Sequence, residues 1–138
     1  MPDARPAPLT GRCLCGTVQF RITGPLGPVV YCHCSQCRRA NGSAFAANAN
    51  VARSDFALLS GAEGITEYES SPNQFRAFCG RCGSPMYSRT TGDPAHVRIR
   101  LGTLDQDPGS RAVLHIWVSA KAPWYDITDT LPQLAEVP

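Results

Sequence analysis

The sequence predicts an all-β fold of packed antiparallel sheets with little helix. Twelve glycines and twelve prolines in 138 residues leave little room for a long helix. Residues 16–23, GTVQFRIT, alternate apolar and polar side chains, which is the pattern of a strand with one buried face. Further short segments rich in β-branched and aromatic residues follow, each bounded by Gly, Pro, Asn, Asp or Ser. Together these features favour many short strands joined by turns.

The predicted elements are short and evenly distributed along the chain. One helix is expected at 35–41, SQCRRAN, because Gly42 follows it in the position that favours a C-cap glycine. The last strand is apolar on both faces, so we expect it to be central in its sheet. The predicted strands are 16–23, 29–32, 43–51, 56–60, 65–70, 74–79, 86–90, 96–104 and 113–119.

Length and composition indicate a single globular domain over residues 9–138, because 138 residues can bury a core and no linker or repeat divides them. The Pro-rich residues 1–8 are expected to be a disordered N-terminal tail. No apolar run reaches the length of a membrane span, and the N-terminus has no apolar signal segment. We therefore expect a cytoplasmic protein without a membrane partner. A net charge of +2 without a basic stripe makes a nucleic-acid partner an unfavoured prediction.

Seven cysteines carry the strongest functional signal. Disulfides would need an oxidising compartment, and an odd count leaves one thiol over. Buried inert cysteines would not explain why every cysteine has a neighbour at CxC or CxxC spacing. Both spacings bring two sulfurs to the same side of the chain, and sulfur ligation selects zinc, with iron as the alternative. The three groups are Cys13 and Cys15, then Cys32, Cys34 and Cys37, then Cys79 and Cys82.

The number of cysteines in each group suggests one closed and one open metal site. Two pairs would make a closed four-thiolate site that staples distant parts of the chain together, so its metal would stabilise the fold. The CHCSQC triplet at 32–37 would leave a fourth position vacant, as catalytic zinc sites do. Three thiolates on Zn²⁺ give a net charge of −1, which suits binding of a further thiol better than formation of hydroxide. Spacing alone leaves open the other division, in which CHCSQC lends two sulfurs to FCGRC.

Four segments resemble the glutathione-dependent formaldehyde-activating enzyme and centromere-protein-V family, in the family's order and spacing. They are GRCLCGTVQF, CHCSQCRRANGSAFAA, FCGRCGSPMY and LHIWVSAKAPWYDITDTLP. The resemblance implies a β-tent fold and carbon–sulfur lyase chemistry, in which the sulfur of glutathione attacks formaldehyde to give S-hydroxymethylglutathione. It also implies two zinc sites. The structural zinc would bind Cys13, Cys15, Cys79 and Cys82, and the open, catalytic zinc would bind Cys32, Cys34 and Cys37 with the thiol as fourth ligand.

Three further residues are candidates for contact with a substrate. Arg38 follows the triplet and can clamp a carboxylate, although a solvated helix end explains it equally well. His115 is expected to be a hydrogen-bonded core histidine, and the family resemblance keeps it as a pocket candidate. Trp117 can wall a pocket or simply belong to the core. His33 lies inside the triplet, but its position between two ligands directs it away from the metal.

The function predicted from these observations is zinc-dependent handling of a glutathione or related thiol adduct of formaldehyde or a similar aldehyde. A non-catalytic zinc-containing thiol carrier is the first alternative, since hemithioacetals also form without an enzyme. A chromatin or nucleic-acid module is the second. The sequence argues against it, because the chain has a single lysine and no basic patch interleaved with aromatic residues.

Overall fold

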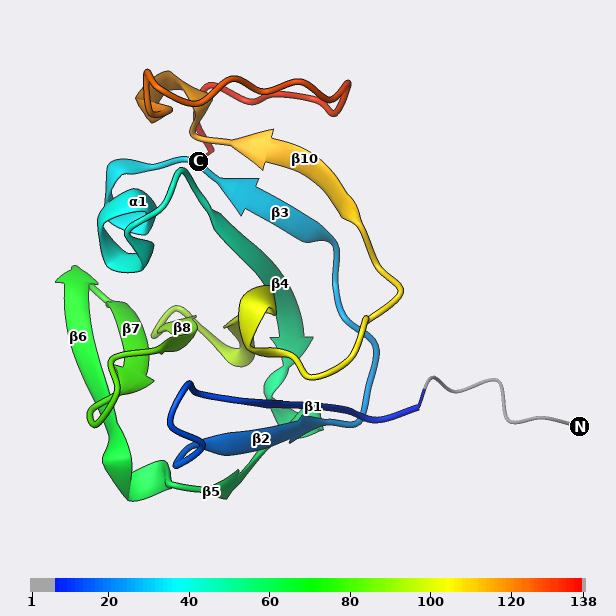
Figure 1. The fold of residues 1–138 in the computed structure, drawn as a ribbon, viewed down its shortest axis with the longest axis vertical. Coiled ribbons are helices and arrows are strands. Elements are labelled where there is room, and N and C mark those ends of the chain that lie inside the picture. The colour runs from blue at the N-terminus through cyan, green and yellow to red at the C-terminus, as the bar shows by residue number, and fades with distance from the viewer. Residues whose placement is uncertain (1–6, 138) are drawn as a thin grey trace, which may run out of the picture.

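The computed structural model describes residues 7–137 and confirms an all-β fold with one α-helix in that range (Figure 1). The tail predicted at 1–8 falls mostly on residues 1–6, which lie outside the described residues. Short 3-10 turns occupy Arg53–Asp55, Ala62–Gly64, Leu101–Thr103 and Val118–Ala120. The other elements are β1 (Leu9–Arg12), β2 (Gln19–Ile22), β3 (Val29–Cys32), α1 (Ser35–Asn41), β4 (Ala46–Ala52), β5 (Phe56–Ser60), β6 (Ile65–Ser71), β7 (Gln74–Cys79), β8 (Pro85–Thr90), β9 (Asp93–Arg100) and β10 (Ala112–Ile116).

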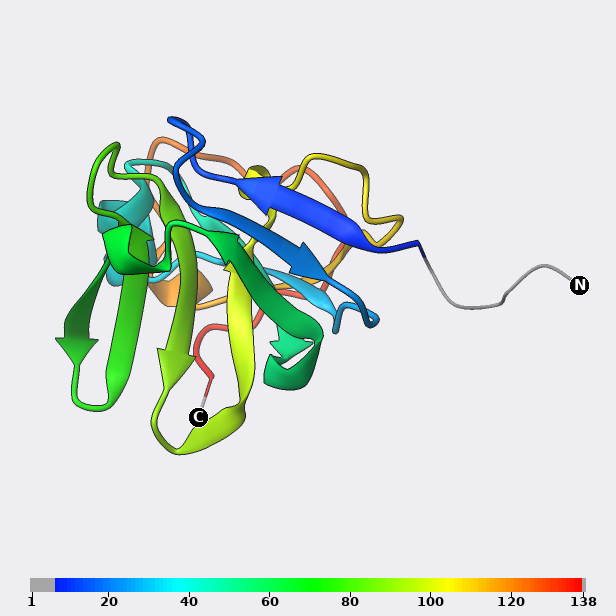
Figure 2. The same ribbon diagram turned by 90° about the horizontal axis from the view of Figure 1, so that it is seen from below.

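The strands form a small and a large sheet. The small sheet has the order β1-β2-β5, and the large sheet has the order β10-β3-β4-β9-β8-β7-β6. Figure 1 shows the small sheet below the curved large sheet, and Figure 2 shows β1 and β2 crossing over the strands of the large sheet. Seven of the eight strand pairings within residues 7–137 are antiparallel, as expected, but β10 pairs with β3 in parallel. A parallel pair is possible here because a long stretch of chain separates the two strands.

The main core lies between the two sheets. Phe20 and Ile22 of β2 are each 1% exposed, whereas Gln19 and Arg21 are exposed, so the predicted alternation is confirmed. Met86 of β8 belongs to the same core cluster. Burial of each such apolar side chain contributes about 1.5–3 kcal/mol, before the entropy cost of ordering the chain. This core fixes the position of the β1–β2 loop relative to the β7–β8 turn, and both of these segments carry cysteines.

The prediction for the last strand was wrong in two respects. The strand ends at Ile116, because Trp117 adopts a left-handed backbone with φ of 58° and the chain turns there. The strand also lies at the edge of the large sheet, not at its centre. Its outer side is covered by the C-terminal segment, since the backbone N–H of His115 donates to the carbonyl of Pro132 and that of Leu134 donates back to His115, both at 2.9 Å. The edge of β10 is therefore paired with the C-terminal segment instead of with another strand of the sheet.

Other boundaries shift for local reasons. The helix forms as predicted, and Gly42 ends it with φ of 63°, a conformation that glycine adopts without strain. The sequence did not predict β1, because Leu9–Arg12 has no apolar alternation. Its Gly11 is needed where the strand crosses the Phe20 ring, because a Cβ atom there would overlap that ring. No helix within residues 7–137 is long and apolar enough to cross a membrane.

Candidate metal centres and the adjoining cavity

Four cysteines from two hairpins meet where the small sheet adjoins the large one. Cys13 and Cys15 lie in the β1–β2 loop, and Cys79 and Cys82 lie at the β7–β8 turn. Their four sulfur atoms all lie within 4.8 Å of one another. The Sγ atoms of Cys13 and Cys15 are 3.6 Å apart, and those of Cys15 and Cys79 are 3.8 Å apart. A tetrahedral zinc with Zn–S bonds of about 2.3 Å requires sulfurs about 3.8 Å apart, so this cluster, the four-sulfur cluster, fits zinc.

Nearby hydrogen bonds favour the thiolate form of Cys82 in the four-sulfur cluster and connect its two hairpins. The hydrogen bond between Ser84 Oγ and Cys82 Sγ, at 3.2 Å, lowers the pKa of Cys82 to about 5. The backbone N–H of Val18 donates to Cys13 Sγ at 3.3 Å. Ser84 Oγ also accepts a hydrogen bond from the backbone N–H of Leu14 at 2.9 Å, which ties the two hairpins together. The cluster can therefore hold a metal ion in a closed set of four protein ligands.

The other three cysteines surround the start of α1. Cys32 is the last residue of β3, Cys34 is the N-cap of α1, and Cys37 lies in its first turn. Their sulfurs also lie within 4.8 Å of one another, and the backbone N–H of Cys37 donates to Cys34 Sγ at 3.3 Å. Hydrogen bonding with Cys32, and then with Cys37, lowers the pKa of Cys34 to about 2. Hydrogen bonding with Cys34, and then with Cys37, raises the pKa of Cys32. This three-sulfur cluster can hold a metal ion with three protein ligands.

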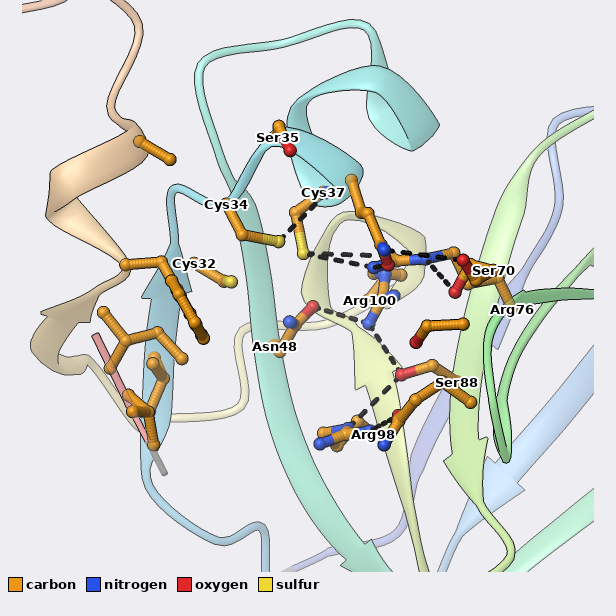
Figure 3. A pocket seen from close by; sticks show the side chains of 18 of the residues that line it. Cys32, Cys34, Ser35, Cys37, Asn48, Ser70, Arg76, Ser88, Arg98 and Arg100 are labelled. Atoms are coloured by element: carbon orange, nitrogen blue, oxygen red, sulfur yellow. Dashed lines mark hydrogen bonds between the residues drawn. The ribbon is translucent and has the colours of Figure 1, made fainter. Parts of the chain in front are cut away.

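The three-sulfur cluster opens onto a cavity of about 730 Å³. Residues of β3 and β4 line one wall of this cavity, and residues of β7, β8 and β9 line the opposite wall (Figure 3). Ile116 and Trp117 also line the cavity, and they pack against the buried cluster that contains Cys32 and Cys37. None of the four cysteines of the four-sulfur cluster lines this cavity. The two clusters thus differ both in ligand number and in access.

Three arginines line the cavity: Arg76 of β7, and Arg98 and Arg100 of β9. Arg76 is nearest to the sulfurs, because its Nη1 and Nη2 atoms each lie 3.7 Å from Cys37 Sγ. Figure 3 shows Arg100 between Arg76 and Arg98 on this wall. Burial lowers the pKa of Arg100 to about 10, so its guanidinium still carries a charge at neutral pH.

The predicted substrate-contact residues fall in different surroundings. Trp117 lines the cavity. Arg38 does not; its Nε atom donates to the carbonyl of Ala120 at 3.1 Å and so fixes the helix to the distant 3-10 turn Val118–Ala120. The arginines that do line the cavity were not among the predicted site residues. One signal was available, because Arg98 and Arg100 alternate with buried residues in HVRIR and therefore share a strand face.

His115 is the middle member of a chain of hydrogen-bonded side chains that joins His33 to Asp129. Its Nδ1 atom is 2.8 Å from Nε2 of His33, and its Nε2 atom is 3.0 Å from a carboxylate oxygen of Asp129. Both histidines are 0% exposed. The His33 imidazole is not among the side chains that could hold a metal ion with Cys32, Cys34 and Cys37, and burial lowers its pKa. His115 therefore fits the expected role of a hydrogen-bonded core histidine, and the chain braces the segment that carries Cys32 and Cys34.

Comparison with known proteins identifies the family. The family model described as glutathione-dependent formaldehyde-activating enzyme matches residues 8–120, a range that contains all seven cysteines. The chain belongs to this family. A crystal structure of a protein from Rhodobacter sphaeroides has a similar fold, with a TM-score of 0.60 and 26% sequence identity. That match covers 71% of the present chain and 89% of the Rhodobacter sphaeroides chain. The formaldehyde-activating family thus supplies a general enzymatic context for the two cysteine clusters.

Proposed function

We propose that this protein forms and cleaves the carbon–sulfur bond between a thiol, such as glutathione, and formaldehyde or a similar aldehyde. In this proposal Cys32, Cys34 and Cys37 hold a catalytic zinc, while the four-sulfur cluster holds a structural zinc. The observation that carries it is the opening of three clustered sulfurs onto a large cavity. Membership of the formaldehyde-activating family supports the choice of substrates.

The difference between the clusters supports the division of roles. Four protein sulfurs fill a tetrahedral site, so an ion there has no position for a substrate. Three sulfurs beside a cavity leave room for one more ligand. Zinc bound by the three-sulfur cluster would provide a fourth coordination position and would favour the thiolate form of a thiol that reaches it.

The residues around the three-sulfur cluster have complementary tasks in this proposal. Ile116 and Trp117 pack against the buried cluster that contains Cys32 and Cys37, and in this proposal they limit access of water from that side. Arg76 places its positive charge beside Cys37 and so offsets part of the negative charge of the thiolates. In the forward reaction the thiol sulfur bonds to the carbonyl carbon, the C=O double bond becomes a single bond, and the oxygen gains the proton that the thiol loses. The reverse reaction breaks the same carbon–sulfur bond.

Exchange NMR tests this function directly. Zinc-loaded protein is added to glutathione and ¹³C-formaldehyde, and the exchange rate of the adduct is compared with the rate without protein. We expect faster exchange with the wild type and the uncatalysed rate with Cys34→Ser, whose fold is checked by circular dichroism. An unchanged rate despite measurable glutathione binding by the wild type would refute catalysis and would identify a thiol carrier instead.

A further inference from the structure

Asp129 lies near the C-terminus and bonds to a buried histidine. Its carboxylate lies 3.0 Å from Nε2 of His115, and the backbone N–H of Leu131 donates to the same side chain at 3.0 Å. The hydrogen bond with His115 lowers the pKa of Asp129, so the carboxylate is ionised at neutral pH. An ionised carboxylate can only accept hydrogen bonds, so it takes the Nε2–H of His115 and leaves Nδ1 for another partner. Asp129 therefore sets the orientation of the His115 ring.

The partner of His115 Nδ1 is His33, the residue between Cys32 and Cys34. The two imidazole nitrogen atoms are 2.8 Å apart, and both rings are fully buried. Within residues 7–137 the other ring nitrogen of His33, Nδ1, has no hydrogen-bond partner. The hydrogen bonding of the His33 side chain therefore depends on His115, and through His115 on Asp129.

The backbone links the position of His33 to the positions of two sulfurs. Cys32 is the last residue of β3, and Cys34 also has an extended backbone, with φ of −61° and ψ of 154°. Neighbouring side chains of an extended chain project to opposite sides. Cys32 and Cys34 line the cavity, whereas His33 and His115 do not. A displacement of His33 would therefore displace the sulfurs on either side of it.

The C-terminal segment, residues 121–137, is joined to this part of the fold. Besides its pairing with His115, it accepts hydrogen bonds from the backbone N–H groups of Val118 and Ser119, at 3.0 and 3.1 Å. Val137, at its end, lines the cavity. Within the part of the chain that the structure describes, no hydrogen bond joins this segment to the loops 13–18 and 79–84, which carry the other four cysteines. Asp129 is thus connected to the three-sulfur cluster and not to the four-sulfur cluster.

We propose that Asp129 is a positioning residue for the three-sulfur cluster, which acts through His115 and His33 to keep Cys32 and Cys34 in the arrangement that binds zinc. This inference rests on the proposed function, which assigns a zinc ion to this cluster, and it adds a residue outside the range 8–120 that matches the family model. A cluster of three protein ligands has no fourth sulfur to retain the ion when one is misplaced, so it depends on such support more than the four-sulfur cluster does. Loss of the Asp129 carboxylate should therefore release zinc from one cluster selectively.

The rate at which zinc-loaded protein releases zinc to a chromogenic chelator tests this role. The wild type should release zinc in two kinetic phases, and the phase that Cys34→Ser lacks belongs to the three-sulfur cluster. We expect Asp129→Ala to accelerate this phase about tenfold and to leave the other phase unchanged. Asp129→Glu, which keeps a carboxylate, should restore part of the retention. Asp126→Ala, which removes an exposed carboxylate from the same segment, should behave as the wild type does.

The outcomes separate positioning from a general loss of stability and from failure of the proposed function. Met86→Ala weakens the buried core, so it should lower Tm and leave the three-sulfur phase unchanged. An equal acceleration in Met86→Ala would overturn the positioning role, because loss of stability alone would then explain the release. Unchanged release in Asp129→Ala would also overturn it, while leaving the proposed function in place. Selective release in Asp129→Ala, from a protein whose wild type does not accelerate exchange between formaldehyde and glutathione, would support the positioning role and refute the proposed function.

Discussion

Replacing Cys82 with serine should destabilise the whole protein. The variant loses one of the four sulfurs that would hold zinc between the two hairpins. Cys15 and Cys79 are 64 positions apart in the sequence, so a metal that joins them closes a long loop. A cross-link over a loop of this length stabilises the folded state by about 4 kcal/mol, mainly through the entropy of the unfolded chain. This is a large part of the 5–15 kcal/mol that stabilises typical domains.

Cys34→Ser provides the matched comparison, because it removes one sulfur from the other cluster. Residues 32–37 form a short local segment, so a metal held there closes only a small loop and contributes about 2 kcal/mol by the same relation. An unfolding entropy of about 2.1 cal/mol/K per residue converts these values to changes in Tm. We expect Tm to fall by about 15 °C in Cys82→Ser and by about 7 °C in Cys34→Ser.

Two measurements on freshly purified protein check this expectation. Mass spectrometry of the metal content should give two zinc ions per chain for the wild type and one for Cys34→Ser. Thermal unfolding followed by circular dichroism gives the two Tm values. An equal decrease in Tm for both variants, or a larger decrease for Cys34→Ser, would refute the division into a structural four-sulfur site and an open three-sulfur site.

Three further predictions concern the surroundings of the clusters. Asp129→Asn should lower Tm by a few degrees, because it weakens the hydrogen bond to buried His115, whereas Asp126→Asn on the exposed surface should not. The same hydrogen bond lowers the pKa of Asp129 in the folded state. The stability that the ionised carboxylate contributes is therefore fully present above the carboxyl pKa of the unfolded chain and is lost as pH falls through the folded pKa. The difference in Tm between wild type and Asp129→Asn should shrink in acid. Met86→Ala should destabilise the core by about 2–5 kcal/mol in urea unfolding without changing the zinc content.

The strands and the helix were largely predictable, because their signals are local. Phe20 and Ile22 alternate with exposed neighbours, and Gly42 follows the only helical segment that the pattern allowed. The last strand was misjudged because its apolar faces have two possible explanations. Apolar side chains on both faces do not specify whether the neighbour at the edge is another strand or the C-terminal segment, and only the folded chain shows that residues 132–135 pair there.

The candidate site was predictable in part for the same reason. Arg38 drew attention because it adjoins Cys37 in the sequence, yet its guanidinium contacts the carbonyl of Ala120. The arginines that line the cavity come from strands that are distant in sequence from the triplet. Their position depends on the pairing of β4 with β9, which no local pattern specifies.

The sequence by itself determined the all-β fold, the short helix and the three groups of cysteines, because periodicity, turn residues and ligand spacing are properties of neighbouring residues. Only the tertiary structure decided which pairs of cysteines meet, which side chains line the cavity beside Cys32, Cys34 and Cys37, and where its positive charge lies. These features depend on sheet order and register. Both are set by packing between segments that lie far apart along the chain.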